Sequence, residues 1–379
     1  MKIMVLGADG FCGWPTSLKL GKEGYEVIMI DNMSRRKIDS KLHSNSLTNI
    51  HSIHHRLNVA KELGYNMHFI NCDITNYREL STYMLKYRPD TIVHFAEQRA
   101  APYSMNSEVE RRYTVDNNIV GTHNVLNAIV DNNPNAHLIH LGTMGVYGYS
   151  KEFGAIPEGY LNVKINSTKK NTDILYPTNP GSVYHMTKSI DQLLFQFYNK
   201  NWGIKITDLH QGIVWGTQTQ ETKLDETLTN RFDYDGMYGT VLNRFISQAA
   251  TGNEITVYGT GGQRRAFIHI QDTAKCVQLA AENPPDSDKV RIFNQVAEVH
   301  SVKDLAMMME KLYQAKVKFL DNPRKELAEN ELEVDNTGLK SLGFEPIKLS
   351  NVLVDDVLYI AQQMKDNMKK ENILTSPRW

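Results

Sequence analysis

The sequence predicts an α/β fold, in which a doubly wound parallel sheet is joined to a smaller, mostly C-terminal α/β domain. Short β-rich runs alternate with helical periods through the first half of the 379-residue chain, as in a parallel sheet with helices on both faces. The first of these runs breaks directly into three glycines spaced three residues apart. After residue 203, strand signals alternate with longer irregular segments. The change in pattern indicates a second domain.

The first element is the apolar run 2–6, which leads into the glycine turn. Glycines at this spacing are typical of a tight turn between a strand and a helix. They let the backbone approach a pyrophosphate without side chains in the way. The helix then directs its free N–H groups and its dipole at the phosphates. The same spacing also occurs in turns that only pack a helix on a strand. The predicted cofactor loop consists of Gly7, Asp9, Gly10, Phe11, Cys12 and Gly13.

The second strand, residues 25–30, leads to Asp31. An acidic side chain at this place accepts both hydroxyls of an adenosine ribose and repels a 2′-phosphate, which favours NAD over NADP. Asn32 follows it and is predicted to contact the same cofactor. Arg35 and Arg36 pose an alternative, because an arginine here can pair with the 2′-phosphate of NADP. Both arginines can instead stack on adenine or contact the pyrophosphate, and we predict NAD because the repulsion from Asp31 is the stronger effect.

Three more strands are predicted at residues 67–73, 90–96 and 136–142. The carboxyl ends of such strands face the cofactor crevice of a Rossmann-type sheet. Residues at these ends are therefore expected near the adenine and the nicotinamide ribose, although each also suits an ordinary loop. The remaining predicted cofactor contacts are Asp73, Ile74, Phe95, Ala96, Glu97 and Asn118.

Bulk composition argues against several classes of partner. Lys and Arg number 42 against 43 Asp and Glu, for a formal net charge of −1, so the basic patch of a nucleic-acid-binding protein is missing. No apolar stretch of about 18 residues is present to span a membrane, and the start of the chain does not resemble a signal peptide. We therefore expect a cytoplasmic protein that binds neither nucleic acid nor a membrane.

The cysteines and histidines do not indicate a metal site. The cysteines show neither metal nor disulfide spacing, which fits a reducing cytoplasm; they are Cys12, Cys72 and Cys276. Four histidines fall close together, but no acidic or cysteine ligand has a matching spacing; they are His43, His51, His54 and His55. We expect these histidines to lie on a solvated helical face and the protein to bind no metal.

Two connections, at about residues 33–65 and 149–179, exceed the few residues usual between a strand and a helix. We expect both to carry structure or function. The domain prediction assigns residues 1–205 to cofactor binding, with the chain returning at about 266–296, and residues 206–379 mainly to substrate binding.

Tyr184 and Lys188 are four residues apart, so a helix places both side chains on one face. A phenol, with a reference pKa near 10, is a poor base, but the Lys188 ammonium and a positively charged nicotinamide ring both lower that pKa. Tyr184 can then accept the proton of a sugar hydroxyl during its oxidation. The alternative is a structural tyrosine beside a surface lysine. The presence of Thr143 favours the catalytic interpretation, because this residue follows the strand at 136–142 and its hydroxyl can orient the reacting alcohol.

Together these positions resemble the extended short-chain dehydrogenase/reductase family of nucleotide-sugar enzymes. The matching residues are Gly7, Gly10, Gly13, Asp31, Thr143, Tyr184 and Lys188. With a later motif, the resemblance covers nearly the whole chain. The resemblance implies bound NAD, a UDP-sugar substrate and a homodimer. Arg265, in the motif at 256–272, matches the family arginine on the nucleotide diphosphate, and Arg324 looks similar to a second one. Either arginine also suits a salt bridge at the rim.

Within the family, several strings are similar to the branch that makes a sulfonated sugar nucleotide from UDP-glucose and sulfite. The strings are 31–36, 95–105, 142–145, 184–188, 230–235 and 242–245. Dehydratases of the family usually carry an Asp-Glu pair directly after the catalytic threonine, where this chain has Met144 and Gly145. Plant members of the branch resemble GTMGEYG, with a glutamate in place of Val146. That carboxylate is therefore not indispensable to the branch.

This resemblance implies oxidation of the sugar at C4, loss of water, addition of sulfite at C6 and reduction of C4. Since sulfite is an anion, Gln98, Arg99 and His185 are expected to hold it or to move protons. A packed helix histidine is an equal alternative for His185. The expected catalytic residues are Thr143, Tyr184, His185 and Lys188. The expected substrate contacts are Gln98, Arg99, Thr143, Gln211, Asn243, Thr256, Tyr258, Arg265 and Arg324.

Two other functions stay open. A UDP-hexose 4-epimerase needs space to rotate a ketosugar and needs no anion site. A sensor of NAD or of a nucleotide sugar has no use for an intact Thr143, Tyr184 and Lys188. The sequence also leaves open whether free sulfite or a sulfur-donor protein supplies the sulfur.

Overall fold

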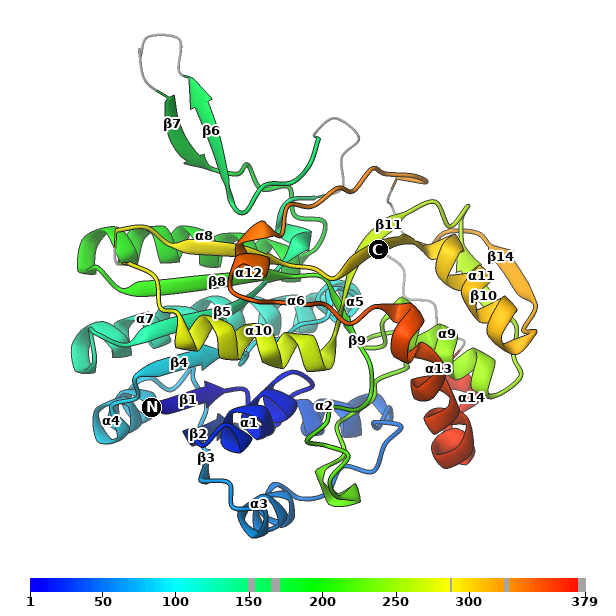
Figure 1. Cartoon of the computed structure of the whole chain (residues 1–379), viewed down its shortest axis with the longest axis horizontal. Helices are drawn as coiled ribbons and strands as arrows, with labels where there is room; N and C mark the ends of the chain where they lie inside the picture. The colour runs from blue at the N-terminus through cyan, green and yellow to red at the C-terminus, as the bar shows by residue number, and fades with distance from the viewer. Residues whose placement is uncertain (149–153, 165–170, 287, 324–326, 374–379) are drawn as a thin grey trace.

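A seven-stranded sheet in which all neighbouring strands are parallel forms the centre of the molecule (Figure 1). The computed structural model describes residues 1–148, 154–164, 171–286, 288–323 and 327–373. In spatial order the strands are β12 (Arg291–Gln295), β8 (Lys205–Gln211), β5 (His137–Thr143), β4 (Thr91–His94), β1 (Lys2–Leu6), β2 (Glu26–Asp31) and β3 (Met67–Asn71). The predicted α/β class is confirmed.

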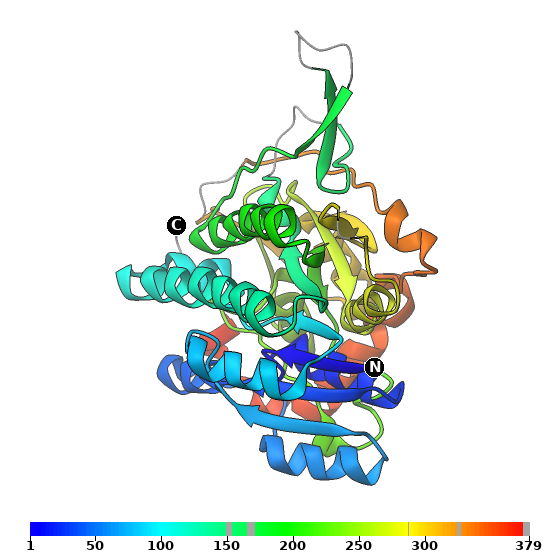
Figure 2. The same ribbon diagram turned by 90° about the vertical axis from the view of Figure 1, so that its left-hand side faces the viewer.

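Helices cover both faces of this sheet, because its strands are apolar on both sides. On one face, Ile3 and Val5 pack with helices α1 (Gly13–Lys22) and α10 (Ile270–Glu282). On the other, Met4 and Leu6 belong to the core beneath three helices. These are α4 (Tyr77–Tyr87), α7 (Gly121–Asn132) and α8 (Val183–Trp202). Figure 2 shows the resulting layers edge-on.

Both long connections contain regular structure. The first forms α2 (Ser34–Leu42) and α3 (Ile53–Glu62). The second contains an antiparallel hairpin of β6 (Tyr160–Lys164) and β7 (Asn171–Leu175), which projects from the body (Figures 1 and 2).

A second core lies beside the carboxyl ends of the sheet strands and contains Trp215, Phe232 and Phe245. Its strands are β9 (Ile213–Trp215), β10 (Ile255–Tyr258), β11 (Arg264–His269), β13 (Glu298–Ser301) and β14 (Val317–Leu320). Its helices are α9 (Val241–Ala250), α11 (Val302–Tyr313), α13 (Leu349–Tyr359) and α14 (Lys370–Ile373).

Short helical segments complete the described chain. They are α5 (Ala101–Asn106), α6 (Glu108–Val115), η1 (Asp116–Val120), η2 (Met144–Val146), η3 (Glu226–Leu228), α12 (Thr337–Ser341), η4 (Ile360–Met364) and η5 (Lys365–Asn367). Within the described residues, no helix combines the length and the apolar character needed to cross a membrane.

The order of the sheet reverses at β1, which lies between β4 and β2. Ligands of open α/β sheets bind outside the carboxyl ends of the strands at such a reversal. The loops after β1, β2, β4 and β5 therefore meet at one crevice.

Candidate active site

Helix α8 presents Tyr184 and Lys188 to this crevice. Ser182 caps the helix by accepting a hydrogen bond from the His185 N–H at 3.2 Å, and the Tyr184 N–H donates to Ser104 Oγ at 3.1 Å. The start of the helix is therefore fixed from two sides. Both site residues are buried and lie one helical turn apart.

Tyr184 lies in an environment that opposes its ionisation. Burial raises the pKa of the phenol above its ordinary value, whereas the Lys188 ammonium and a hydrogen bond with Thr143 lower it. The carboxylate of Glu97 acts in the same direction as burial. Lys188 thus has the expected effect, but desolvation of the phenolate outweighs it.

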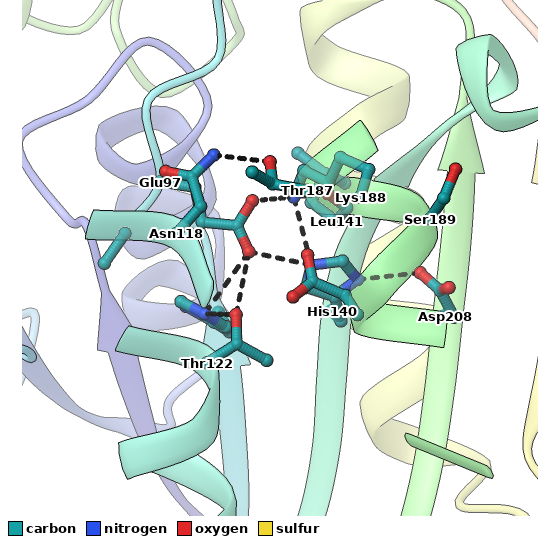
Figure 3. Close-up of polar contacts among 12 residues, drawn as sticks. Glu97, Asn118, Thr122, His140, Leu141, Thr187, Lys188, Ser189 and Asp208 are labelled. Atoms are coloured by element: carbon teal, nitrogen blue, oxygen red, sulfur yellow. Dashed lines mark hydrogen bonds and ion pairs between the residues drawn. The ribbon is translucent and has the colours of Figure 1, made fainter. Parts of the chain in front are cut away.

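Lys188 ends in a buried cluster of polar side chains (Figure 3). Its ammonium donates to the Leu141 carbonyl at 2.7 Å, lies 3.0 Å from His140 Nε2 and forms an ion pair with Glu97. Burial lowers the pKa of Lys188, but Glu97 and Tyr184 raise it by more. Lys188 therefore carries its charge directly beneath Tyr184.

A first cavity, with about 980 Å³ of empty space, lies over the reversal point of the sheet. Two of its glycines permit close backbone approach. Gly7 has a φ of +81°, and a Cβ there would lie 2.7 Å from the backbone of Phe95 and Ala96. A Cβ on Gly13 would lie 2.0 Å from the Gly7 carbonyl oxygen. Such a turn against the N-terminus of α1 fits a dinucleotide pyrophosphate.

Asp31 lines the first cavity at the end of β2. One carboxylate oxygen accepts the Asp9 N–H at 2.9 Å and the other accepts the Met33 N–H at 2.7 Å. Burial and the Asp9 carboxylate raise the pKa of Asp31 to about 6. An anionic Asp31 fits ribose hydroxyls and disfavours a phosphate in the same place.

The two arginines after Asp31 are both paired with carboxylates. Arg36 donates from Nε and Nη2 to Asp9 at 2.7 and 2.8 Å. Arg35 pairs with Asp39 and, at 3.1 Å, with Asp233. A 2′-phosphate would have to compete with these pairs, and bidentate guanidinium–carboxylate contacts are strong.

Most of the predicted cofactor contacts line the first cavity: Gly7, Gly10, Phe11, Cys12, Gly13, Asp31, Asn32, Arg35, Ile74, Phe95, Ala96, Glu97, Tyr184 and Lys188. Four do not belong to the lining of either cavity within the described chain: Asp9, Arg36, Asp73 and Asn118. Asp73 accepts from Asn32 Nδ2 at 2.8 Å, and Asn118 accepts the Gln98 N–H at 2.8 Å. These side chains position the loops around the cavity.

A second cavity, with about 1920 Å³ of empty space, adjoins the first. Six residues line both: Phe11, Cys12, Arg99, Tyr184, Gln211 and Tyr238. The predicted residues in its lining are Arg99, Thr143, Tyr184, His185, Gln211, Thr256, Tyr258 and Arg265. Tyr184 therefore lies where the contents of the two cavities meet.

Two predicted substrate contacts lie elsewhere. Asn243 is buried, is not in the lining of either cavity, and donates to the Asp233 carbonyl at 3.0 Å. Its neighbour Arg244, which the sequence prediction missed, is in the lining of the second cavity. The similar string at 242–245 was the available signal, and the helical phase of α9 decides which of its residues faces the cavity. Arg324 lies outside the described residues.

The three predicted sulfite residues differ in what they can do. Arg99 lines both cavities and pairs with Asp233 at 2.5 Å. The Gln98 amide donates to Ala100 and Thr114 and accepts the Ala100 N–H, so it is committed to the loop. Burial lowers the pKa of His185 to about 4. A neutral His185 cannot supply the positive charge that an anion site needs.

Residues 3–295 match the model of the NAD dependent epimerase/dehydratase family. A solved variant of the UDP-glucuronic acid 4-epimerase of Bacillus cereus, in complex with NAD and a fluorinated UDP-glucuronic acid, has the same fold. Its TM-score is 0.69 at 25% identity, over 96% of this chain and 99% of that one. The chain belongs to the NAD dependent epimerase/dehydratase family, and NAD is its cofactor.

Two relatives match the whole length of this chain. The chloroplastic UDP-sulfoquinovose synthase of Spinacia oleracea is 43% identical over 385 aligned residues, which cover 79% of that protein. The UDP-sulfoquinovose synthase of Sulfolobus acidocaldarius is 39% identical over 98% of its length. Within the wider family, the chain belongs with the UDP-sulfoquinovose synthases.

Proposed function

We propose that this chain converts UDP-glucose and sulfite to UDP-sulfoquinovose and water. The observation that carries the proposal is the place of Tyr184, Thr143 and Arg99 around the junction of the two cavities. A base, a hydroxyl and a cation thus surround the point where the sugar meets the nicotinamide. The likeness to two synthases along the full chain supports the same reaction.

The first chemical step is oxidation of the sugar C4 hydroxyl. Tyr184 accepts the hydroxyl proton, Thr143 orients the oxygen and Lys188 stabilises the tyrosinate. NAD held in the first cavity would supply the acceptor for the hydride from C4 and would return it at the end of the cycle. The residues proposed to hold NAD are those of the first cavity, with Asp31 on the adenosine ribose.

The next steps exchange the C6 oxygen for sulfur. A ketone at C4 acidifies the C5 proton, so the C6–O bond breaks and water leaves. Sulfite then forms a C6–S bond, and a proton returns to C5. Arg99 attracts the sulfite anion. Neutral His185, whose Nδ1 lies 3.0 Å from Ser182 Oγ, is placed to carry a proton.

The second cavity is proposed to hold UDP-glucose. Arg244 is buried there, its Nε has no hydrogen-bond partner among the described residues, and its Nη2 lies 3.3 Å from Thr256 Oγ1. A guanidinium in this position suits a diphosphate, with Arg265 as a second cation. Gln211 Oε1 also lacks a partner among the described residues and is available to a sugar hydroxyl. Residues 206–379 would thus mainly bind the nucleotide sugar, and residues 1–205 with 266–296 the NAD.

A product assay separates this function from 4-epimerisation. Purified protein with UDP-glucose and sulfite should form a sugar nucleotide with a carbon–sulfur bond at C6, without net consumption of NAD, as mass spectrometry can show. Arg99→Ala should raise the sulfite requirement more than the UDP-glucose requirement. Accumulation of UDP-galactose without a sulfonated product at any sulfite concentration would establish the epimerase instead. A parallel assay in which a sulfur-donor protein replaces free sulfite tests whether such a protein supplies the sulfur.

We also propose that the protein is a homodimer. Large apolar side chains follow the outer face of α8, with exposed fractions of 62% for Leu193 and 55% for Phe197. Val120, next to this helix in η1, is also exposed. A second copy would cover this face. Leu193→Asp should convert the dimer to a monomer in analytical ultracentrifugation, and an unchanged mass would contradict this surface.

A cytoplasmic location is the remaining proposal. All three cysteines are buried and unpaired, namely Cys12, Cys72 and Cys276. Buried thiols without a partner are expected in a reducing compartment.

A further inference from the structure

The ion pair of Glu97 and Lys188 is buried on both sides. The side chains are 2% and 4% exposed, respectively. Glu97 follows β4 and Lys188 lies on α8, so the contact joins two separate elements beneath Tyr184. Figure 3 shows the carboxylate pointing at the ammonium from the side of Asn118 and Thr122. A pair closed off from water interacts more strongly than one at the surface.

His140 extends this pair into the sheet. Its Nε2 lies 3.1 Å from Glu97 Oε1, and its Nδ1 lies 2.8 Å from Asp208 Oδ1. The second oxygen of Asp208 lies 2.9 Å from His210 Nε2, and His210 Nδ1 lies 2.7 Å from Tyr147 Oη. His140 lies on β5, Asp208 and His210 lie on the neighbouring strand β8, and Tyr147 directly follows η2. The chain of contacts therefore fixes Glu97 and His140 in place.

The charges of this buried cluster nearly balance. Burial and Lys188 lower the pKa of His140, but Asp208 and Glu97 raise it by more, to about 9. Burial raises the pKa of Glu97, but Lys188 and His140 hold it well below the usual value. Two cations, Lys188 and His140, thus face two anions, Glu97 and Asp208. Loss of one anion would leave a buried cation without compensation.

The other titratable groups that act on Glu97 or Lys188 are His94, Tyr184 and Asp191, and Arg99 acts on Tyr184. Burial lowers the pKa of His94 to about 3, so His94 is neutral near pH 7, and burial raises the pKa of Asp191 well above its usual value. Ligand atoms of Glu97, His140 and Asp191 lie within 4.8 Å of one another. The Lys188 ammonium contacts Glu97 and His140, so a cation already lies among these three side chains.

We propose that Glu97 is a positioning residue for the reaction: with His140 as its support, it holds the Lys188 ammonium in place beneath Tyr184, and its own negative charge sets the basicity of Tyr184. This inference rests on the proposed oxidation at C4 but not on the sulfite steps. Glu97 was predicted from the sequence as a cofactor contact, and the contact to Lys188 gives it a second role. Its negative charge opposes the effect of Lys188 on Tyr184.

The sign of the effect follows from electrostatics. A nearby anion disfavours a tyrosinate, so Glu97→Gln should lower the pKa of Tyr184. Glu97→Asp keeps the charge but shortens the side chain. It should leave the pKa near that of the wild type, while weaker positioning of Lys188 slows the reaction. His140→Gln removes a cation from the cluster and should raise the pKa of Tyr184.

The experiment measures the reduction of bound NAD by UDP-glucose in the absence of sulfite, across a range of pH. This step is shared by synthases and epimerases, so the result does not depend on the sulfur chemistry. In Glu97→Gln the acidic limb of the rate profile should move to lower pH by about one unit, and the maximal rate should fall about tenfold or more. Glu97→Asp should keep the wild-type limb with a reduced rate. The matched control is Glu221→Gln, because Glu221 is also fully buried but pairs with Lys22.

Thermal unfolding shows whether each variant is folded. If folded Glu97→Gln keeps the wild-type limb, as Glu221→Gln should, Glu97 only fills space and the proposal is overturned. If Glu97→Gln does not fold, His140→Gln and Glu97→Asp decide. The proposal is supported if the acidic limb of the rate profile moves to higher pH in His140→Gln and keeps its wild-type position in Glu97→Asp. It is refuted if the acidic limb has the same position in both variants. Absence of any NAD reduction in the wild type would refute the proposed C4 oxidation itself.

Discussion

The two cavities differ in whether a buried cation in the lining has a carboxylate partner. In the first cavity Arg35 pairs with Asp39 and Asp233, and Lys188 pairs with Glu97. In the second cavity, no carboxylate among the described residues lies within ion-pair distance of Arg244. Burial lowers the pKa of this guanidinium, which shows how costly its charge is in the absence of an anion.

We infer from this difference how each ligand would be recognised. NAD is proposed to be recognised by backbone shape at Gly7 and Gly13 and by the carboxylate of Asp31. We propose that the nucleotide sugar is recognised instead by Arg244, whose positive charge the diphosphate would balance. Arg99 belongs to both cavities and pairs with Asp233, so the protein already balances part of its positive charge.

The largest effect is expected at the boundary between the cavities. Tyr184→Phe should leave both ligands bound, because the ring still packs, but should slow turnover by about a hundredfold to ten-thousandfold. Isothermal calorimetry with UDP-glucose and steady-state rates measure the two quantities. Binding lost to the same degree as turnover would show that Tyr184 is structural.

Substitution of the cations in the second cavity should separate the two ligands. Arg244→Ala and Arg265→Ala should each weaken UDP-glucose binding by about 1.5–3 kcal/mol, since each removes a charge-assisted contact. NAD affinity should hardly change. Arg112→Ala, on an exposed surface pair with Glu108, is the control. Equal losses for both ligands would indicate a damaged fold and would remove the distinction between the cavities.

The first cavity can be tested by its preference for NAD over NADP. Asp31→Ala should weaken NAD binding by about 1–3 kcal/mol, because ribose hydroxyls lose their acceptor. It should also relax the discrimination against NADP. Asp9→Asn should add to this relaxation, since it weakens the pair that holds Arg36. Fluorescence titration with both dinucleotides measures this, and an unchanged preference in Asp31→Ala would refute the ribose contact.

The fold was predictable because its signals are local. The strands that end in the crevice are short apolar runs, and the glycine turn after residue 6 specifies a close approach that other residues cannot make. The predicted strands at 67–73, 90–96 and 136–142 correspond to β3, β4 and β5, whose ends differ by at most two residues. The hairpin within 149–179 was missed, because most of its residues are exposed and carry no clear alternation.

The partners of the charged side chains were harder to predict, because they depend on tertiary contacts. Asp9 and Arg36 are 27 positions apart in the sequence, and no local pattern shows that they pair. The cluster behind Lys188 did leave a signal. A fully buried parallel strand normally reads as a continuous apolar run, yet β5 contains His140, and β8 contains Asp208 and His210. Polar residues at such positions indicate a buried network.

The smallest effect expected concerns two buried histidines whose pKa values move in opposite directions. The pKa of His140, beneath the first cavity, is raised to about 9, and that of His185, beside the second, is lowered to about 4. His140 therefore contributes stability below its unfolded pKa of about 6.5, which is lost as the pH rises toward about 9. His185 contributes stability above about 6.5, which is lost as the pH falls toward about 4. In urea unfolding across pH, His140→Gln should flatten the alkaline side of the stability curve and His185→Gln the acidic side, each by at most about 1.4 kcal/mol per pH unit. If both variants changed the same side of the stability curve, the pKa values of the two histidines would be shifted in the same direction. The contrast between the cavities would then not include these histidines.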